Sequence, residues 1–204
     1  MIIETTSDLM LIGEEEISVK AQELLPQEIE RLVEWLDLKE DKVRYQAFLL
    51  LQAKSRKDSG VYSFWEVFHS KLTNSNSYQR SLGIMLIAEN VQWDTEHKMM
   101  NTITDYLKCL NDEKPITIRQ CIQALKLIVQ KVPNYNKEIM EGLLAFDIMI
   151  IRESMRKVIM CDLIDTLLEI RKHEKHEDID TFIFQALTGE VLDEKSKKQI
   201  KKKL

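Results

Sequence analysis

Apolar residues recur three and four positions apart along most of the chain, and no segment alternates apolar and polar residues over the length of a strand. A spacing of three and four places apolar side chains on one face of an α-helix. Gly, Pro, Asn and Ser fall between these periodic segments, where a helix would have to end. The pattern therefore predicts an all-α protein.

The same pattern gives approximate helix bounds. Pro26 and Pro115 stand where proline is tolerated, in the first turn of a helix, and Pro133 stands where a helix would end. Asn76 or Ser77, and Asp94 or Thr95, are expected to cap two further helices. The expected helices cover about residues 14–24, 26–36, 41–57, 60–72, 77–90, 95–110, 115–132, 136–149, 153–171, 178–188 and 193–203. Because no Gly or Pro lies between Leu143 and Arg152, a single bent helix across that stretch is an open alternative.

Four of these segments resemble one another. They begin at Asp41, Asn76, Pro115 and Glu153, and each has a cap, then an arginine, then a dense apolar helix. The arginines are spaced by 36, 39 and 37 residues, and the positions three residues later hold small or apolar side chains. These arginines are Arg44, Arg80, Arg119 and Arg156, followed by Ala47, Gly83, Ile122 and Ile159. A shorter amphipathic helix precedes each one, and pairs of helices at this period are the signature of a solenoid.

This pattern resembles the second helix of a HEAT repeat, most clearly in Val43-Arg44, Ile118-Arg119 and Met155-Arg156. The resemblance, to a divergent HEAT/armadillo-like helical repeat protein, covers about residues 27–171. It implies an α-α superhelix, a solenoid of about four to five helix pairs. We expect residues 1–26 to form an acidic segment with a capping helix, 27–171 to form four HEAT-like pairs, and 172–204 to form capping helices with a Lys-rich tail.

Charge is unevenly distributed along the chain. Residues 1–41 hold twelve acids and three bases, whereas residues 193–204 hold six lysines and two acids, within a net charge of −5. An acidic N-terminal region would repel a phosphate backbone, so nucleic acid is an unlikely partner on charge grounds. A partner protein with a basic segment would suit this region. The Lys-rich end could meet an acidic partner or a membrane surface, or simply be a solvated tail.

Composition also addresses location. The first sixteen residues lack a basic stretch and a continuous apolar run, so we expect no secretory signal. No stretch approaches the length of a membrane span, and the apolar run from Ile148 to Ile151 is far too short for one. Cys109, Cys121 and Cys161 each sit in a helical apolar pattern and are expected to be reduced core residues of a cytoplasmic protein.

The regular arginine row and the tryptophans are the candidate partner contacts. Arginines at one repeat position could line a groove that binds an acidic peptide or phosphate. The resemblance to HEAT repeats instead implies that each arginine contacts a neighbouring repeat. Exposed tryptophan would also serve a binding surface, although core packing is the plainer interpretation. Among the tryptophans, Trp93 is expected in a turn and partly exposed. The candidate contacts are Trp35, Arg44, Arg80, Trp93, Arg119 and Arg156.

Catalytic and metal-binding patterns are weak. His173 and His176, with Glu174, Glu177 and Asp178, contain an i, i+3 histidine pair but not the HExxH arrangement, so a solvated linker is favoured over a metal site. Asp162 and Asp165 could form a paired acid site, although a polar helix face that pairs with arginine is the simpler interpretation. No GxSxG, GxxxxGK or GxGxxG motif occurs. We expect no catalytic residue, metal or cofactor.

Two functional hypotheses follow. The first is a non-catalytic protein–protein interaction scaffold or adaptor built on a HEAT-like solenoid. The alternative is an enzyme resembling the alkylpurine DNA glycosylases, some of which are HEAT-like solenoids of similar size that use aromatic and acidic residues in a basic groove. Trp93 and Asp94 are the residues that keep this alternative open.

Overall fold

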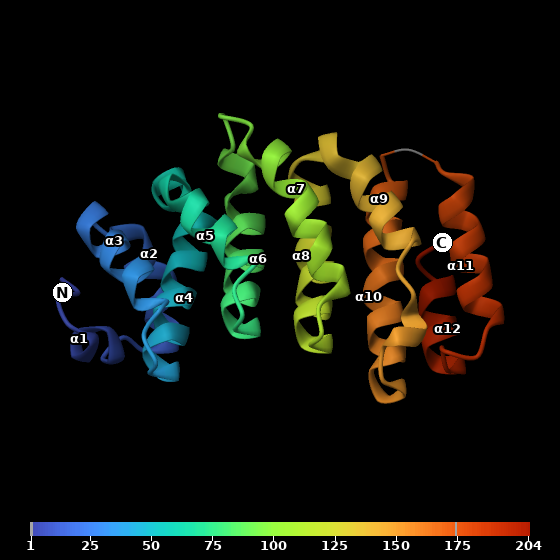
Figure 1. The fold of residues 1–204 in the computed structure, drawn as a ribbon, viewed down its shortest axis with the longest axis horizontal. Helices are drawn as coiled ribbons and strands as arrows, with labels where there is room; N and C mark the ends of the chain where they lie inside the picture. Colours follow the sequence, from blue (N-terminus) through green and yellow to red (C-terminus); the bar gives the residue numbers. More distant parts are fainter. Residues whose placement is uncertain (1, 174) are drawn as a thin grey trace. The chain divides into compact units, whose positions relative to one another are not determined.

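The structure is a computed structural model that describes residues 2–173 and 175–204. In these residues it contains α-helices, short 3-10 segments and no β-strand, which confirms the prediction of an all-α chain. Figure 1 shows the helices in chain order. Their bounds are α1 Thr6–Met10, α2 Ile17–Glu23, α3 Pro26–Trp35, α4 Asp41–Ser55, α5 Trp65–Lys71, α6 Ser77–Asn90, α7 Lys98–Lys108, α8 Pro115–Lys131, α9 Asn136–Leu144, α10 Glu153–Arg171, α11 Glu177–Thr188 and α12 Glu194–Lys201.

The chain forms two compact units, unit 1 from Met1 to Thr102 and unit 2 from Ile103 to Leu204. The division falls within α7 and inside the stretch 27–171 that the sequence assigned to one repeat array.

Several predicted caps are present. Pro26 and Pro115 occupy the first turns of α3 and α8, where the missing N–H removes no helical hydrogen bond. The Asn76 side chain accepts a hydrogen bond from the backbone N–H of Tyr78 at the start of α6. Local signals of this kind fix helix ends because they satisfy backbone groups that the helix itself leaves unpaired.

The sequence missed α1. Thr5 caps this helix: its hydroxyl accepts the N–H of Asp8 at 3.2 Å, and the Asp8 carboxylate accepts the N–H of Thr5 at 2.8 Å. Hydrogen bonds from Thr5 lower the pKa of Asp8, so the carboxylate stays charged at the positive end of the helix. This reciprocal pair is a capping box, a local signal present in the sequence.

Three predicted helices are shorter than expected. The helix expected over 60–72 begins only at Trp65, as α5, because Ser59–Phe64 forms a 3-10 segment. α7 begins at Lys98 rather than at residue 95, because Asp94 caps it from four residues upstream, across a turn in which His97 has a φ of 57°. The helix expected over 136–149 ends at Leu144, and a separate 3-10 segment spans Ile148–Ile150. The alternative of one bent helix across this stretch is therefore wrong.

In unit 1, α4 packs against α2, α3 and α6, and α5 packs along α6. The apolar run Leu82 to Ala88 on α6 is buried except for the half-buried Met85. A Cβ atom on Gly83 would lie 2.6 Å from the carbonyl oxygen of Phe68. The small residue predicted at this repeat position therefore permits the close approach of α5 and α6.

Unit 1 also buries charged groups. Glu28 is 1% exposed, and its carboxylate accepts the N–H groups of Ile3 and Leu25, both at 2.8 Å, and the ammonium of Lys20 at 3.0 Å. Burial raises the pKa of Glu28, but these hydrogen bonds outweigh it and lower the pKa below its usual value. The ionised carboxylate therefore links the N-terminal segment and α2 to the start of α3.

A second buried bridge joins α5 to the end of α3. The ammonium of Lys71 donates to Asp37 at 2.6 Å and to the side-chain oxygen of Gln79 at 2.8 Å. The Gln79 amide in turn donates to the carbonyl of Leu36 at 2.6 Å. Buried polar groups of this kind stabilise one arrangement of helices only while all of their partners remain in place.

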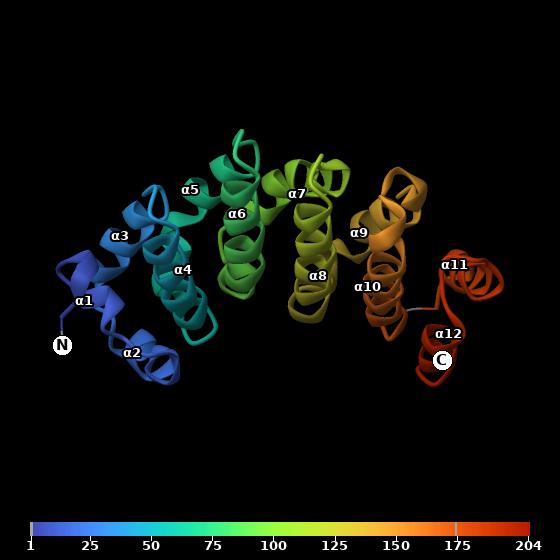
Figure 2. The same cartoon turned by 90° about the horizontal axis from the view of Figure 1, so that it is seen from below.

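In unit 2, α8 and α10 pack lengthwise, and α10 also contacts α9, α11 and α12. Figure 2 shows α8 and α10 side by side. The interface is apolar, with residues such as Ile122, Leu125, Leu163 and Leu167 fully buried. Two polar side chains, Thr117 on α8 and Thr166 on α10, are buried with this interface.

Two further predictions concern the state of the cysteines and the hydropathy of the helices. All three cysteines are free thiols; Cys109 and Cys121 are buried, as expected, while Cys161 is half-buried. Burial raises the pKa of the Cys121 thiol, which therefore stays protonated and unreactive at neutral pH. Within the described residues, no helix combines the length and the apolar character needed to cross a bilayer.

Candidate functional site

Two of the four repeat arginines reach a neighbouring helix. Arg44 pairs with Asp41 in its own first turn, and its guanidinium lies 4.6 Å from the centre of the Tyr78 ring on α6. Arg119 on α8 pairs with Asp162 on α10 at 2.7 Å. Both guanidinium groups therefore have partners within the protein.

The other two arginines bind the segment that precedes their own helix. Arg80 donates to the carbonyl of Asn74 at 2.7 Å. Arg156 donates to the carbonyl of Ile151 at 2.7 Å and to that of Met149 at 3.1 Å. Positive charge at such carbonyls stabilises the turn. The row that is regular in the sequence thus divides into two structural roles.

The tryptophans lie in unit 1. Trp35 and Trp93 are half-buried, and the Trp93 indole donates to the carbonyl of Ser55 at 2.7 Å. Trp65 is fully buried and donates to the hydroxyl of Thr102 at 3.0 Å. The partial exposure predicted for Trp93 is present, but its polar edge is occupied by an internal hydrogen bond.

Asp94, the acid beside Trp93, acts as a helix cap. One carboxylate oxygen accepts the N–H of Lys98 and the other accepts the N–H of Met99, both at 2.8 Å. The Tyr62 hydroxyl donates to the first of these oxygens at 2.7 Å. Burial and the neighbouring Asp94 charge raise the pKa of Tyr62 well above its usual value, so the phenol stays protonated and keeps donating.

The candidate metal and acid sites are dispersed. Of the histidine cluster, Glu174 lies outside the described residues, and elsewhere in the described chain no three His, Cys, Asp or Glu side chains converge on one point. Asp162 accepts from Arg119 and Gln123, whereas Asp165 pairs with Lys203 at 2.6 Å. The simpler interpretation of these two aspartates, a polar face that pairs with bases, describes their contacts.

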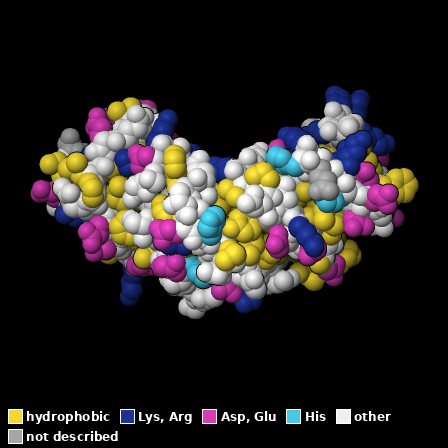
Figure 3. Space-filling view, turned by 90° about the horizontal axis from the view of Figure 1, so that it is seen from above, with side chains coloured by type: hydrophobic (Ala, Val, Ile, Leu, Met, Phe, Trp, Pro, Cys, Tyr) yellow, Lys and Arg dark blue, Asp and Glu magenta, His cyan; other side chains and the backbone are white. Residues whose placement is uncertain are grey.

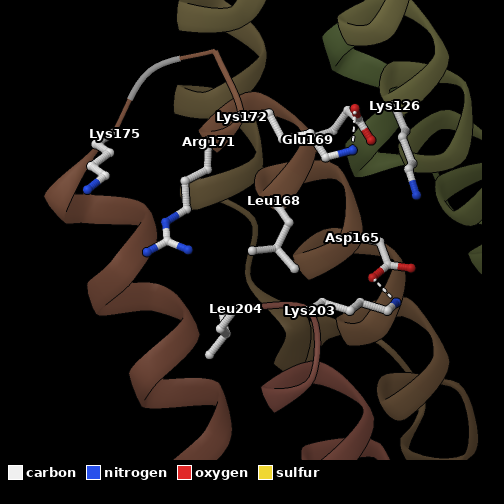
Figure 4. A pocket seen from close by; sticks show the side chains of 9 residues that line it. All are labelled: Lys126, Asp165, Leu168, Glu169, Arg171, Lys172, Lys175, Lys203 and Leu204. Atoms are coloured by element: carbon white, nitrogen blue, oxygen red, sulfur yellow. Dashed lines mark hydrogen bonds and ion pairs between the residues drawn. The ribbon is translucent and has the colours of Figure 1, made fainter.

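A hollow of about 560 Å³ on unit 2 is lined mainly by basic side chains, and we name it the basic pocket. Figure 4 shows its lining, and Figure 3 shows Lys and Arg side chains gathered at the end of unit 2 that carries the last residues of the chain. Five bases and two acids surround it, with leucine side chains between them. The lining residues are Lys126, Asp165, Leu168, Glu169, Arg171, Lys172, Lys175, Lys203 and Leu204.

Three of the five bases are neutralised by an acid. Lys203 pairs with Asp165, Lys172 pairs with Glu169 at 2.9 Å, and Arg171 lies 2.9 Å from Asp180 on α11. Burial raises the pKa of Glu169, but hydrogen bonds from Lys172 and Gln130 outweigh it and leave the pKa lowered. Glu169 is therefore charged at neutral pH and holds Lys172.

Lys126 and Lys175 differ from the other three bases. Within the described residues neither side chain takes part in an ion pair or hydrogen bond, although Lys126 is close enough to favour the charged form of Glu169. In Figure 4 the two ammonium groups lie on opposite sides of the hollow, one from α8 and one from the segment before α11. These are the cations that the pocket has available for a ligand.

Sequence reasoning missed this pocket because its bases come from four separate stretches, at residues 126, 171–172, 175 and 203. Only the Lys-rich end was recognised beforehand, and of its six lysines Lys203 alone lines the pocket. Burial of the facing apolar sides of α8 and α10 brings the others together, which no local pattern announces.

Unit 1 carries a smaller hollow of about 370 Å³ with the opposite charge. Glu15, Glu16 and Glu23 line it together with Ile12 and Val19, while Lys20 is engaged by Glu28. The acidic region recognised in the sequence therefore includes a shaped surface, and the expectation of a basic partner segment there stays a prediction.

Comparisons with protein-family models, with curated proteins and with solved structures gave no significant match for this chain. Any assignment of function therefore rests on the residues described above.

Proposed function

We propose that the chain is a non-catalytic protein-interaction scaffold or adaptor of the cytoplasm, built from HEAT/armadillo-like helix pairs in an α-α superhelix. The observation that carries the proposal is the basic pocket, which combines bases with leucine side chains and no nucleophile–base pair. Such a lining binds a charged partner surface rather than activating a reacting group. The opposite charge of the hollow on unit 1 offers a second surface of different specificity.

The repeat arginines support the proposed helix-pair architecture. Arg119 crosses to the next second helix, as the resemblance to HEAT repeats implies, and Arg44 reaches the next repeat through Tyr78. The same geometry argues against their use as partner contacts. We therefore place the principal contacts at the basic pocket.

The glycosylase alternative would need a carboxylate that is free to act beside an aromatic side chain. Asp94 has both oxygens occupied by backbone N–H donors, and the Trp93 indole is bonded to Ser55. This favours a structural role for both residues. In the experiment below, capture that disappears with nuclease would favour a nucleic-acid partner and return this alternative to consideration.

Affinity capture from the host's lysate tests the proposal when it is run on matched proteins. The bait variants are wild type, Lys126→Gln/Lys175→Gln in the pocket, and Lys137→Gln/Lys195→Gln, which removes the same charge from exposed positions outside the pocket. We expect a protein that survives nuclease treatment and is lost only with the pocket variant. Capture that disappears with nuclease, or that is equal for all three baits, would contradict the proposal.

A further inference from the structure

The basic pocket has the features of a selective anion site rather than of a diffuse positive surface. Its two unengaged lysines, Lys126 and Lys175, come from different segments and line one hollow. The other three bases are held in place by Asp165, Glu169 and Asp180. A ligand would therefore meet two available charges within a fixed frame of ion pairs.

Part of the pocket's positive charge has an internal explanation. Arg171 and Lys172 stand at the C-terminal end of α10, where cations stabilise the helix dipole. Lys126 lies in the middle of α8, and Lys175 precedes α11, so neither occupies a helix end that needs positive charge. The ligand-binding role is thus assigned to these two lysines alone.

The lining between the charges is apolar. Leu168 is half-buried on α10, and Leu204 is exposed on the opposite wall. An anion without an apolar part would leave these surfaces in contact with water. A ligand that carries carboxylates next to an aliphatic side chain would satisfy both parts of the lining.

We propose that the basic pocket, through Lys126 and Lys175, binds an acidic segment of a partner protein in which Glu or Asp residues flank a large apolar residue. This identifies the kind of partner for the scaffold proposed above and rests on that function. The apolar residue would lie against Leu168, and the flanking carboxylates would lie near the two ammonium groups.

A nucleic acid fits this site less well. A phosphate backbone needs a continuous basic stripe, whereas the pocket also contains the carboxylates of Asp165 and Glu169. The chain as a whole carries a net charge of −5, which would oppose the approach of a long polyanion. A short acidic segment meets only the local field of the pocket.

Fluorescence anisotropy tests this with defined probes. The main probe is a short labelled peptide of alternating Glu and Leu; one control peptide replaces Glu by Gln, and another replaces Leu by Ser. For the intact protein at low salt, we expect the Glu/Leu peptide to bind and both controls to bind more weakly. Raising the salt concentration should weaken binding of the Glu/Leu peptide, because the two lysines are exposed to solvent screening.

The matched variants locate the site. Lys126→Gln/Lys175→Gln should raise the dissociation constant for the Glu/Leu peptide about tenfold, whereas Lys137→Gln/Lys195→Gln should change it by less than about twofold. Both variants should keep the wild-type circular dichroism spectrum, because none of the four lysines holds an ion pair in the described residues. An equal loss in both variants would mean that bulk charge, not the pocket, attracts the peptide, and would overturn the inference.

Two further outcomes decide whether the inference about the basic pocket holds. If a duplex oligonucleotide displaces the peptide at equal concentration and depends on the same two lysines, the pocket binds phosphate and the inference is wrong. If the peptide binds as expected but lysate capture does not depend on the pocket, the site stands while the scaffold function fails. The two proposals can therefore fail separately.

Discussion

The two units use polar side chains in opposite ways. Unit 1 buries many of them, including charged Glu28, Lys54, Lys71 and Glu89, whereas the buried polar residues in the described part of unit 2 are Thr117 and Thr166. Unit 1 has 17 acids and 11 bases, and unit 2 has 17 acids and 18 bases. Four charged side chains of unit 1 thus take part in its packing, whereas none of the charged side chains in the described part of unit 2 is buried.

This difference teaches that charge content alone does not locate a binding surface. The more acidic unit uses several of its charges internally, where removal of one partner leaves the other buried and unsatisfied. The nearly neutral unit leaves Lys126 and Lys175 available. Because all three tryptophans lie in unit 1, their fluorescence follows that unit, while hydrogen exchange follows each unit separately.

The largest expected effect is the loss of the buried carboxylate in unit 1. Glu28→Ala should lower the free energy of unfolding of unit 1 by about 3–5 kcal/mol, since it removes the acceptor of two backbone N–H groups and a buried carboxylate that pairs with Lys20. Urea unfolding followed by tryptophan fluorescence measures this. Amide exchange in α10 of unit 2 is the control, and equal destabilisation there would show that the units do not differ as described.

Matched glycine substitutions should separate the units next. Gly83→Ala in unit 1 should destabilise by about 1–3 kcal/mol, because its Cβ would lie 2.6 Å from a backbone oxygen that cannot move aside. Gly142→Ala in unit 2 meets only the end of the flexible Leu107 side chain at 3.3 Å, so it should stabilise α9 by up to about 1 kcal/mol. Thermal unfolding of both variants tests the pair, and a reversed order would contradict the close packing of α5 on α6.

Acid should weaken unit 1 through Glu28. The pKa of Glu28 is lowered in the folded state, so its contribution is fully present above the unfolded value near 4.5 and is lost as pH falls through the folded value. The urea concentration at the midpoint of unfolding, followed by fluorescence, should therefore decrease as the pH is lowered below about 4.5. Glu28→Gln should make this midpoint less dependent on pH. A variant with the wild-type pH profile would show that other carboxylates control the acid transition.

The smallest expected effect concerns the surface pair of unit 2. Arg119 and Asp162 are 37% and 17% exposed, so a double-mutant cycle with alanine at both positions should give a coupling of only about 0.2–1 kcal/mol. Urea unfolding followed by circular dichroism, with amide exchange in α8 and α10, provides the free energies. A coupling above about 2 kcal/mol would place this pair among interactions of the buried kind.

Helix ends were predictable where a residue acts on its own backbone. Pro26, Asn76 and Pro115 mark helix starts correctly, because each effect depends on the next few residues only. The same reasoning could have found α1 from Thr5 and Asp8 but did not. The start of α7 was placed too early, since Asp94 caps it through a turn whose length the cap residue does not specify.

The candidate site was less predictable. Trp93 is half-buried, as expected. The repeat arginines, which the sequence offered as candidates to line a groove, instead contact Asp162, carbonyl groups or an aromatic ring within the protein. A regular position in a sequence reports a repeated environment, which is as often structural as functional. Contacts between helices, not spacing, distinguish the two.

The sequence by itself determined that this protein is helical and where most of its helices begin and end, because periodicity and capping act over a few residues. Only the tertiary structure decided which charged side chains form ion pairs within the protein and which remain available to a ligand. Packing of α10 against α8, α11 and α12 brings Lys126, Lys175 and Lys203 to one hollow, while Asp165 neutralises Lys203. The physical reason is that a charge acts through space, and distance in space is set by packing rather than by position along the chain.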